Sequence, residues 1–432
     1  MLEELKSAAR KVGEERNLRS LIDDCKRLLS ARGEANSVAI ARDLVGRFGA
    51  LPDPMRVNFF DHLAHAFSPD PKQVLDSAKA YARNPDAANL LRLTRVTEPP
   101  RQELLRRINR TPGGTSSIVA MRRTLLDLLT AQPQLEQVEA DFLHLLSSWF
   151  NPGFLELKRV DWNASAQLLE QLIRHEAVHE IDGWDDLRRR LQPDRRCFAF
   201  FHPQLPSEPL IFVEVALVPE MPAAIAPLID KASTPLAPNQ FKVAAFYSIS
   251  NCQPGLKGVS LGNFLIKRVA EELQRELPQV KTFCTLSPIP GFARWVRAGA
   301  TCQGLPKGRA ERLAKAHAGL LEACGGDLAV LTRKARLAEL PPAVDEALLR
   351  LGAFYLAYRS TQPGGDPVAR FHLDNGARLE RLNARADLSA KGLAQSFGLM
   401  VNYLYDLDRI EAHHEQFVQG EVAHSRALAG LM

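Results

Sequence analysis

Hydrophobic positions between residues 242 and 295 predict a strand–helix–strand unit around which the rest of the chain is organised. Two short apolar runs, Val243 to Ile249 and Val280 to Leu286, have the composition of buried strands. Between them, apolar residues recur at steps of three and four, as on one face of a helix, at Leu261, Phe264, Leu265, Val269, Leu273 and Leu277. Parallel strands joined by such a helix normally belong to a larger sheet.

Residues 1–150 have a helical period throughout and predict an all-α bundle. Prolines near the first turn mark new helices at Asp53-Pro54, Asp70-Pro71 and Glu98-Pro99-Pro100. Apolar stripes such as Phe60, Leu63, Ala64 and Phe67 would bury against neighbouring helices. Asn151-Pro152-Gly153 is the expected boundary, which gives a helical domain at 1–150 and an α/β domain at 151–432.

The second half of the chain mixes strand and helix signals. Strands are expected at 197–202 and 210–217, and a helical cover at 294–351. Asp374-Asn375-Gly376 predicts a hairpin turn between strands 368–373 and 378–382, with His372 on the first of them. A helix is expected at 386–400, with Asn402 to Tyr405 following its end. The fold class is therefore α+β multidomain, a helical bundle followed by an α/β domain with a mixed sheet.

Composition and charge narrow the function only slightly. The 432 residues are 46% hydrophobic and 24% charged, as in a folded globular protein. A net charge of +5 gives no argument for a nucleic-acid partner but suits a polyanionic ligand. Six scattered cysteines indicate free thiols in a reducing compartment. No run of 18 apolar residues occurs and the N-terminal stretch contains four glutamates, so we expect a cytoplasmic protein without a membrane partner.

One stretch matches a sequence pattern of zinc proteases. His175-Glu176-Ala177-Val178-His179 matches the H-E-x-x-H pattern, in which two histidines on one helix face bind zinc. Ile181-Asp182-Gly183 is expected to end that helix almost at once, and no convincing third ligand follows. We therefore expect the end of a surface or core-edge helix here, and no metal site.

A glycine-rich loop precedes the predicted central helix. Glycines let the backbone approach a phosphate, and the helix N-terminus offers N–H groups and a positive dipole end. The dinucleotide fingerprint and the P-loop are both absent. The segment Q-P-G-L-K-G-V-S-L-G instead resembles the pyrophosphate loop of the acyl-CoA-binding N-acetyltransferase (GNAT) superfamily. The resemblance implies substrate binding by the loop residues Lys257, Gly258, Val259, Ser260, Leu261, Gly262 and Asn263.

Three blocks, the first of which contains this loop, make the resemblance more specific. FYSISNCQPGLKGVSLGNFLIKRVAEELQRELP, LSPIPGFARW and FHLDNGARLERLNARADLSAKGLAQSFGLMVNYLY together resemble the malonyl-CoA decarboxylase family in content, order and spacing. The likeness runs from about Asp141 to Asp406. It implies a helical N-terminal domain, a GNAT-like catalytic domain and a homo-oligomer, either a dimer or a tetramer. The implied activity is that of a carboxy-lyase acting on malonyl-CoA to give acetyl-CoA, with no cofactor.

The same resemblance implies the catalytic residues. Ser287 of L-S-P-I-P-G-F and His372 of F-H-L-D-N-G-A occupy the family's catalytic serine and histidine positions, and Tyr405 matches an active-site tyrosine. Asn402 is a weaker substrate-binding candidate. The sequence does not decide which of Ser287 and His372 delivers a proton. Ser260 stands where some family members carry a glutamate near the substrate, so the groups that support the catalytic pair remain open.

Two other functions are compatible with parts of the chain. The strand–helix–strand unit alone would also fit a CoA-dependent N-acyltransferase. Ser287 and the F-H-L-D-N-G block favour decarboxylation, because acyl transfer to an amine does not call for them. A non-enzymatic acyl-CoA sensor or scaffold would instead use the helical domain, in which we expect oligomerisation and no chemistry.

Overall fold

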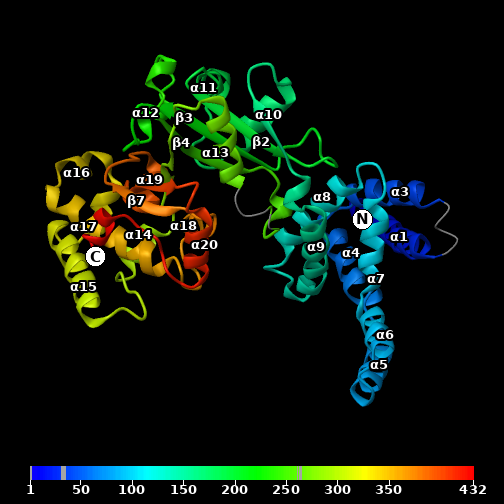
Figure 1. Ribbon diagram of the computed structural model, residues 1–432. Helices are drawn as coiled ribbons and strands as arrows, with labels where there is room; N and C mark the ends of the chain where they lie inside the picture. Colours follow the sequence, from blue (N-terminus) through cyan, green and yellow to red (C-terminus); the bar gives the residue numbers. More distant parts are fainter. Residues whose placement is uncertain (1, 31–35, 260, 262–264) are drawn as a thin grey trace. The chain divides into compact units, whose positions relative to one another are not determined.

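The chain forms two compact units in the computed structural model, which describes residues 2–30, 36–259, 261 and 265–432 (Figure 1). The first unit comprises residues 1–155 together with the short segments 202–208 and 253–261. The second comprises 156–201, 209–252 and 262–432. The helical unit thus takes in two segments from the sequence of the α/β half, one of which is the start of the glycine loop.

The first unit is built of helices, as its periodicity predicts. They are α1 (Leu2–Leu29), α3 (Ser37–Gly49), α4 (Asp53–Ala66), α5 (Pro71–Arg83), α6 (Ala87–Thr97), α7 (Pro100–Asn109), α8 (Gly114–Leu128) and α9 (Glu136–Trp149). The proline signals are confirmed at α4, α5 and α7. The Asp70 carboxylate, for example, accepts hydrogen bonds from the backbone N–H groups of Lys72 and Gln73 and so caps α5.

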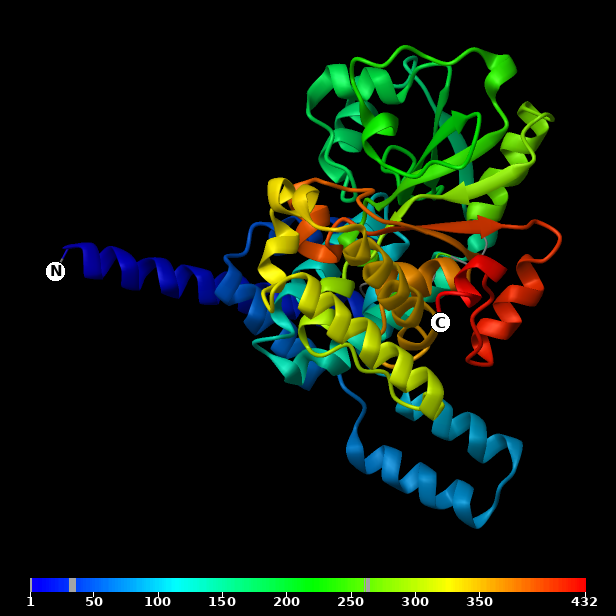
Figure 2. The same ribbon diagram turned by 90° about the vertical axis from the view of Figure 1, so that its left-hand side faces the viewer.

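Aromatic packing forms the core of this helical unit. Phe48 and Phe59 lie with ring centroids 5.1 Å apart, and Phe60 meets Phe142 at 6.5 Å, in tilted and edge-on arrangements. Helices α5 and α6 pack on each other as a hairpin that extends from the other helices of the first unit (Figure 2). The hairpin exposes 53% of Leu75, 46% of Leu90 and 58% of Leu91. Its apolar side is therefore not covered by the described residues.

The second unit contains an eight-stranded mixed sheet in the order β1-β2-β3-β4-β5-β8-β6, with β7 paired to β8. The strands are β1 (Glu156–Val160), β2 (Arg195–Phe201), β3 (Ile211–Val218), β4 (Val243–Asn251), β5 (Thr282–Thr285), β6 (Ser287–Pro288), β7 (Arg378–Asn383) and β8 (Met400–Tyr405). Strands β4 and β5 pair in parallel, and the other strand pairs are antiparallel. Helix α13 (Leu265–Glu276) joins β4 to β5, which confirms the predicted central unit.

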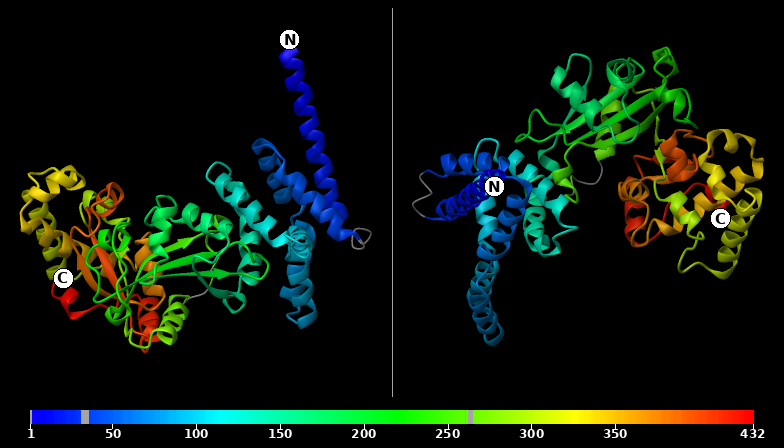
Figure 3. Two further views of the ribbon diagram at one scale, coloured as in Figure 1. Left: turned by 90° about the horizontal axis from the view of Figure 1, so that it is seen from above. Right: turned by 180° about the vertical axis from the view of Figure 1, so that it is seen from behind.

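Both faces of the sheet are covered, and side-chain alternation shows by which helices. On β2, Phe200 points to α13, where the Arg268 guanidinium lies 5.3 Å from its ring centroid. On the opposite face, Ala199 belongs to a cluster with Leu169 of α10 (Ala166–His175) and Leu187 of α11 (Gly183–Arg190). The left view of Figure 3 shows the ribbon of the sheet and its neighbouring helices from above. Every residue of β2 and β3 is accordingly buried.

Strand β1 was not predicted from the sequence. Its residues Glu-Leu-Lys-Arg-Val have too little apolar alternation to indicate a strand, because β1 lies at the edge of the sheet and is mostly exposed. It pairs with β2 from Glu156 opposite Phe201 to Val160 opposite Cys197. Pairing with a buried neighbour, not local composition, determines this strand.

The predicted hairpin around His372 is wrong. Residues 367–374 form helix α18 (Pro367–Asp374), and β7 pairs with β8 and not with a preceding strand. Asp366-Pro367 supplies a helix start, since the Asp366 carboxylate caps the N–H groups of Val368 and Ala369. Gly376 has a positive φ of 78°, and an added Cβ would lie 2.3 Å from the Ile410 carbonyl oxygen. The same Asn-Gly pair that favours a hairpin turn also ends a helix.

The predicted helix at 386–400 is also too long. Helix α19 spans Ala390–Ser396, and β8 begins at Met400, so Asn402 and Tyr405 lie on a strand and not beyond a helix end. The remaining helices of this unit are α12 (Ala226–Ile229), α14 (Phe292–Arg297), α15 (Lys307–Ala323), α16 (Lys334–Glu339), α17 (Pro342–Phe354), α20 (Ile410–Val418) and α21 (Arg426–Ala429). Within the described ranges, no helix has the length and apolar content needed to cross a lipid bilayer.

Candidate active site

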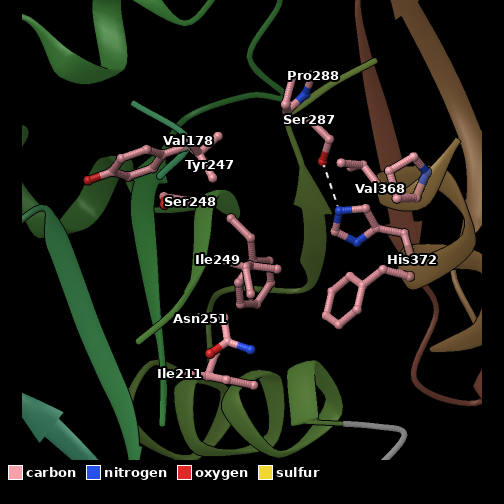
Figure 4. A pocket seen from close by; sticks show the side chains of 13 residues that line it. Val178, Ile211, Tyr247, Ser248, Ile249, Asn251, Ser287, Pro288, Val368 and His372 are labelled. Atoms are coloured by element: carbon pink, nitrogen blue, oxygen red, sulfur yellow. Dashed lines mark hydrogen bonds between the residues drawn. The ribbon is translucent and has the colours of Figure 1, made fainter. Parts of the chain in front are cut away.

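A cavity of about 300 Å³ in the second unit is lined mainly by β4, by β6 and by α18 (Figure 4). Its walls are mainly apolar, with a few polar groups. The apolar lining comes from Val178, Ile211, Phe246, Ile249, Pro288, Pro367, Val368 and Phe371, and the polar lining from Tyr247, Ser248, Asn251, Ser287 and His372. A largely apolar cavity with a few convergent polar groups has the general form of a small-molecule site.

Ser287 and His372 meet at the wall of this cavity. The Ser287 Oγ lies 3.0 Å from His372 Nε2, although 85 positions separate the two residues in sequence (Figure 4). Both side chains are buried, with 5% and 4% of their surface exposed. The structure therefore brings together the two residues that the family resemblance placed at the catalytic positions, at hydrogen-bond distance.

Tyr405 joins the pair from the other side of the imidazole. Its hydroxyl lies 2.8 Å from His372 Nδ1, so that both ring nitrogens have a partner. Tyr403, two residues earlier on β8, stacks on the imidazole with centroids 4.5 Å apart and an interplanar angle of 27°. Strand alternation explains this, because residues 403 and 405 point to the same face of the sheet. The histidine is consequently held at both nitrogens and on one ring face.

Burial sets the protonation of these groups. It lowers the pKa of His372 to about 3, because the imidazolium form loses its hydration. Burial also raises the pKa of Tyr405 well above its ordinary value. At neutral pH the protein without substrate therefore has a neutral imidazole beside a protonated phenol.

A carboxylate explains how two segments so far apart in sequence meet. One oxygen of Asp366 caps α18, and the other accepts the backbone N–H of Gly291, four residues after Ser287, at 3.0 Å. A Cβ on Gly291 would lie 2.2 Å from the Tyr355 hydroxyl, so only glycine fits there without rearrangement. Asp366 thereby ties the S-P-I-P-G segment to the helix that presents His372.

Thr285 supports the serine from the last position of β5. Its Oγ1 accepts a hydrogen bond of 2.8 Å from the Ser287 hydroxyl and one of 3.2 Å from the Tyr403 backbone N–H. The threonine is 1% exposed and does not line the cavity.

Asn402 has contacts of a different kind. Its Nδ2 donates to the carbonyl oxygens of Thr285 at 2.7 Å and Pro222 at 3.1 Å, and its Oδ1 accepts from Arg381 and Asn383. The residue is fully buried and is not among those that line the cavity. These contacts are structural, and the predicted role of Asn402 in substrate binding gains no support from them.

The glycine loop lies partly in the first unit. Of the predicted binding residues, Lys257, Gly258, Val259 and Leu261 are described, whereas Ser260, Gly262 and Asn263 lie outside the described residues. Gly258 has a φ of 80°, a conformation that favours glycine. The start of the loop is held by Arg122 of α8, which donates to the carbonyl oxygens of Gly255 and Lys257 at 2.7 Å each.

The H-E-x-x-H stretch does not form a helix face with two histidines. Helix α10 ends at His175, and the buried Glu176 carboxylate instead accepts hydrogen bonds from the hydroxyls of Ser248 and Ser250 on β4. Among the residues that the structure describes, no three His, Cys, Asp or Glu side chains cluster as metal ligands would. Glu176 instead anchors the segment that carries Val178 into the cavity wall.

Sequence reasoning missed Thr285, Asp366 and Arg122. A signal existed for Thr285, since a residue two positions before Ser287 in an extended segment faces the same side. Asp366 had a helix-capping signal that the stronger hairpin reading obscured. Arg122 gave no signal, because one arginine on an amphipathic helix cannot be distinguished from a surface residue by its sequence.

Comparisons with known proteins agree with this arrangement. The family model described as malonyl-CoA decarboxylase C-terminal domain matches residues 153–432, and the N-terminal domain model matches residues 67–150. Malonyl-CoA decarboxylase, mitochondrial, of Mus musculus is 37% identical over 393 residues, covering 85% of this chain and 79% of that protein.

Solved structures agree over nearly the whole chain. The malonyl-CoA decarboxylase of Rhodopseudomonas palustris is 46% identical with a TM-score of 0.85, covering 96% of this chain and 99% of that one. The enzyme from Agrobacterium vitis is also 46% identical, with a TM-score of 0.84 over 95% and 99% of the two chains.

A helical unit, an α/β unit with a mixed sheet and these matches define the class, a carboxy-lyase of two-part architecture. The chain belongs to the malonyl-CoA decarboxylase family.

Proposed function

We propose that this protein converts malonyl-CoA to acetyl-CoA and CO2, with Ser287 and His372 acting together on one substrate. The observation that supports the pair is their 3.0 Å contact at the wall of a largely apolar cavity. Family membership supports the substrate.

The reaction needs no external electron acceptor. When the bond between the α-carbon and the carboxylate breaks, its electrons move into the thioester carbonyl and give an enolate. The enolate then takes up one proton at the α-carbon, and solvent supplies this proton overall. The protein has to position the carboxylate, stabilise the enolate oxygen and deliver the proton.

The cavity suits this change in charge. Charge leaves the carboxylate as CO2 forms, and apolar side chains such as Ile249 and Phe371 solvate a carboxylate poorly. They therefore favour the loss of CO2, which carries no charge. Ser287 and His372 supply the polar contacts on the same wall.

We also propose that the loop Lys257–Asn263 binds the pyrophosphate of CoA at the start of α13. The positive φ of Gly258 and the hydrogen bonds from Arg122 to the Gly255 and Lys257 carbonyl oxygens support a fixed backbone at the start of the loop. A helix N-terminus then offers N–H groups and a favourable dipole to the phosphates.

A homo-oligomer and a cytoplasmic location complete the proposal. The uncovered leucines of the α5–α6 hairpin support assembly, and six free cysteines suit a reducing compartment. The mouse relative is named as a mitochondrial enzyme. Subcellular fractionation of the native source tests the location, and recovery in an organelle fraction would contradict it.

Incubation with malonyl-CoA tests the activity directly. Purified full-length protein should release CO2 and acetyl-CoA in equal amounts from malonyl-CoA labelled in its free carboxylate. Inclusion of amine acceptors tests acyl transfer in the same assay. An acylated amine without CO2 release would favour an N-acyltransferase and contradict the proposal.

A further inference from the structure

We infer that Thr285 is a positioning residue that fixes the direction of the hydrogen bonds through Ser287 and His372, so that His372 is the proton donor. The inference rests on the proposed function, because it assigns roles within the same site. It begins from the two hydrogen bonds that Thr285 accepts.

The direction of the first bond follows from the geometry. The Ser287 hydroxyl donates to Thr285 Oγ1 at 2.8 Å. The Tyr403 N–H donates to the same oxygen at 3.2 Å. A threonine oxygen has two acceptor positions, and these two donors occupy both. Thr285 therefore accepts the hydrogen bond from the Ser287 hydroxyl and does not donate one to it.

The direction of this hydrogen bond determines which nitrogen of His372 carries the proton. A serine hydroxyl has one hydrogen, and Thr285 receives it, so the 3.0 Å contact with His372 has to be donated by the imidazole. The proton of the neutral ring therefore lies on Nε2. Nδ1 is then an acceptor, and the Tyr405 hydroxyl, 2.8 Å away, donates to it. In this arrangement the Ser287 hydroxyl, both nitrogens of His372 and the Tyr405 hydroxyl each have a hydrogen-bond partner.

This arrangement assigns the roles. The Nε2–H of His372 lies at the cavity wall, where its only partner among the described residues is the Ser287 oxygen that also lines the cavity. It transfers to the α-carbon of the enolate: the enolate electrons form the new C–H bond, and the electrons of the broken N–H bond stay on Nε2 as an imidazolate. Solvent restores the proton in each turnover. Ser287 holds this N–H in place and offers its remaining lone pair toward the cavity.

Without Thr285 the direction would not be fixed. The serine proton could then turn to Nε2, the ring proton would move to Nδ1, and the histidine would have no proton to give at the cavity. The pair would still be in contact, but in two arrangements instead of one. Thr285→Val tests this, because valine has the shape of threonine and no acceptor. Thr285→Ser keeps the acceptor.

The first measurement does not depend on turnover. Nitrogen-15 spectra of histidine-labelled full-length protein, with His372 assigned by its loss in His372→Gln, should show the Nε2–H form of a neutral ring. Thr285→Val should give a mixture of the two tautomers, and Thr285→Ser the wild-type form. A wild-type His372 protonated at Nδ1, or an unchanged tautomer in Thr285→Val, would overturn the inference whatever the activity.

The second measurement uses malonyl-CoA decarboxylation. Thr285→Val should lower kcat about tenfold, the usual scale for loss of one orienting hydrogen bond, with KM nearly unchanged. Thr285→Ser should recover most of that loss. Thr282→Val is the matched control, since Thr282 begins the same strand outside this chain of hydrogen bonds, and its kcat should equal that of wild type.

A double variant separates positioning from simple structural support. In a Ser287→Ala background, Thr285→Val should cause no further loss, because the hydroxyl that it orients is gone. An equal loss in both backgrounds would mean that Thr285 acts on folding alone, and the inference would be wrong. Absence of CO2 release by wild type contradicts the proposed function, whereas the tautomer measurement still decides the role of Thr285.

Discussion

At the scale of single residues, the site depends on the protonation state of His372 and on the direction of the hydrogen bonds that it makes. His372 is buried, neutral and held at both nitrogens by Ser287 and Tyr405. A buried histidine is ordinarily a packing residue. Its placement at a cavity wall, with a hydroxyl on either side, fits the proton transfer that we propose.

Removing either partner should slow turnover without much change in binding. We expect Ser287→Ala and His372→Ala each to lower kcat by ~10²–10⁴-fold, the usual value of a general acid or base, with KM changed far less. The double variant should lose much less than the product of the two factors, because groups that act as a unit are not additive. Steady-state kinetics with malonyl-CoA gives all three values. A fully multiplicative loss would show that the two residues serve separate steps.

Acid should destabilise the protein through its buried histidines. Burial lowers the pKa of His372 to about 3 and that of His179 to about 4, whereas both titrate near 6.5 in an unfolded chain. Between pH 4 and 6.5 the unfolded state therefore binds more protons, so the free energy of unfolding rises with pH across this window. Urea unfolding at several pH values should show that rise.

His372→Gln provides the comparison for this pH dependence. Glutamine does not titrate, so the slope of unfolding free energy against pH should be flatter in the variant than in wild type. Identical slopes would contradict a neutral, buried His372.

At the scale of elements, short contacts between distant segments determine the site. Helix α18 presents His372, the segment after β5 presents Ser287, and Asp366 joins the two through the Gly291 N–H. Similarly, α8 of the helical unit holds the glycine loop through Arg122, which the Glu139 carboxylate keeps in place. The helical unit thus contributes to a segment that sequence reasoning assigned to the catalytic half alone.

Loosening that loop should weaken substrate binding more than turnover. Arg122→Lys cannot donate to the Gly255 and Lys257 carbonyls in the same two-pronged way. We expect KM for malonyl-CoA to rise roughly tenfold, the scale of a lost hydrogen bond to a charged group, with a smaller change in kcat. Arg123→Lys, at the exposed neighbouring position on α8, is the control and should resemble wild type. If calorimetry showed unchanged CoA binding in Arg122→Lys, the proposal that this loop binds the substrate would be contradicted.

At the scale of the whole molecule, the helical unit leaves an apolar surface uncovered. Leu75, Leu90 and Leu91 of the α5–α6 hairpin are each about half exposed. Exposed leucines gathered on one hairpin are typical of a protein contact. A second copy of the chain would bury them and complete the proposed homo-oligomer.

Replacing all three leucines by serine should lower the mass measured by light scattering toward that of one chain. Their burial against a second copy is the driving force that the substitution removes. Val418→Ser is the matched control, because Val418 is 69% exposed on α20 of the other unit. An unchanged association state in the triple variant would place the contact elsewhere.

Much of the fold could be read from local patterns. The helical N-terminal region, the proline-marked helix starts and the β4–α13–β5 unit follow from periodicity and from capping, both of which act over a few residues. The predictions were wrong where one local signal fits two structures: Asp-Asn-Gly ends α18 instead of turning a hairpin. Strand β1 was missed because an edge strand needs few apolar residues.

For the candidate site, too, some features could be predicted from the sequence and others depend on the tertiary structure. The sequence by itself determined which residue types are present, a serine after a strand, a histidine before Asp-Asn-Gly and glycines before a helix, and family resemblance gave them roles. Only the tertiary structure placed Ser287 3.0 Å from His372 Nε2, placed the Tyr405 hydroxyl beside Nδ1 and directed the hydrogen bond of the Ser287 hydroxyl to Thr285. The physical reason is that periodicity and capping act between neighbours in the chain. The direction of a hydrogen bond and the pKa of a buried ring depend on groups from β5, β8 and α18, which only the packed sheet brings together.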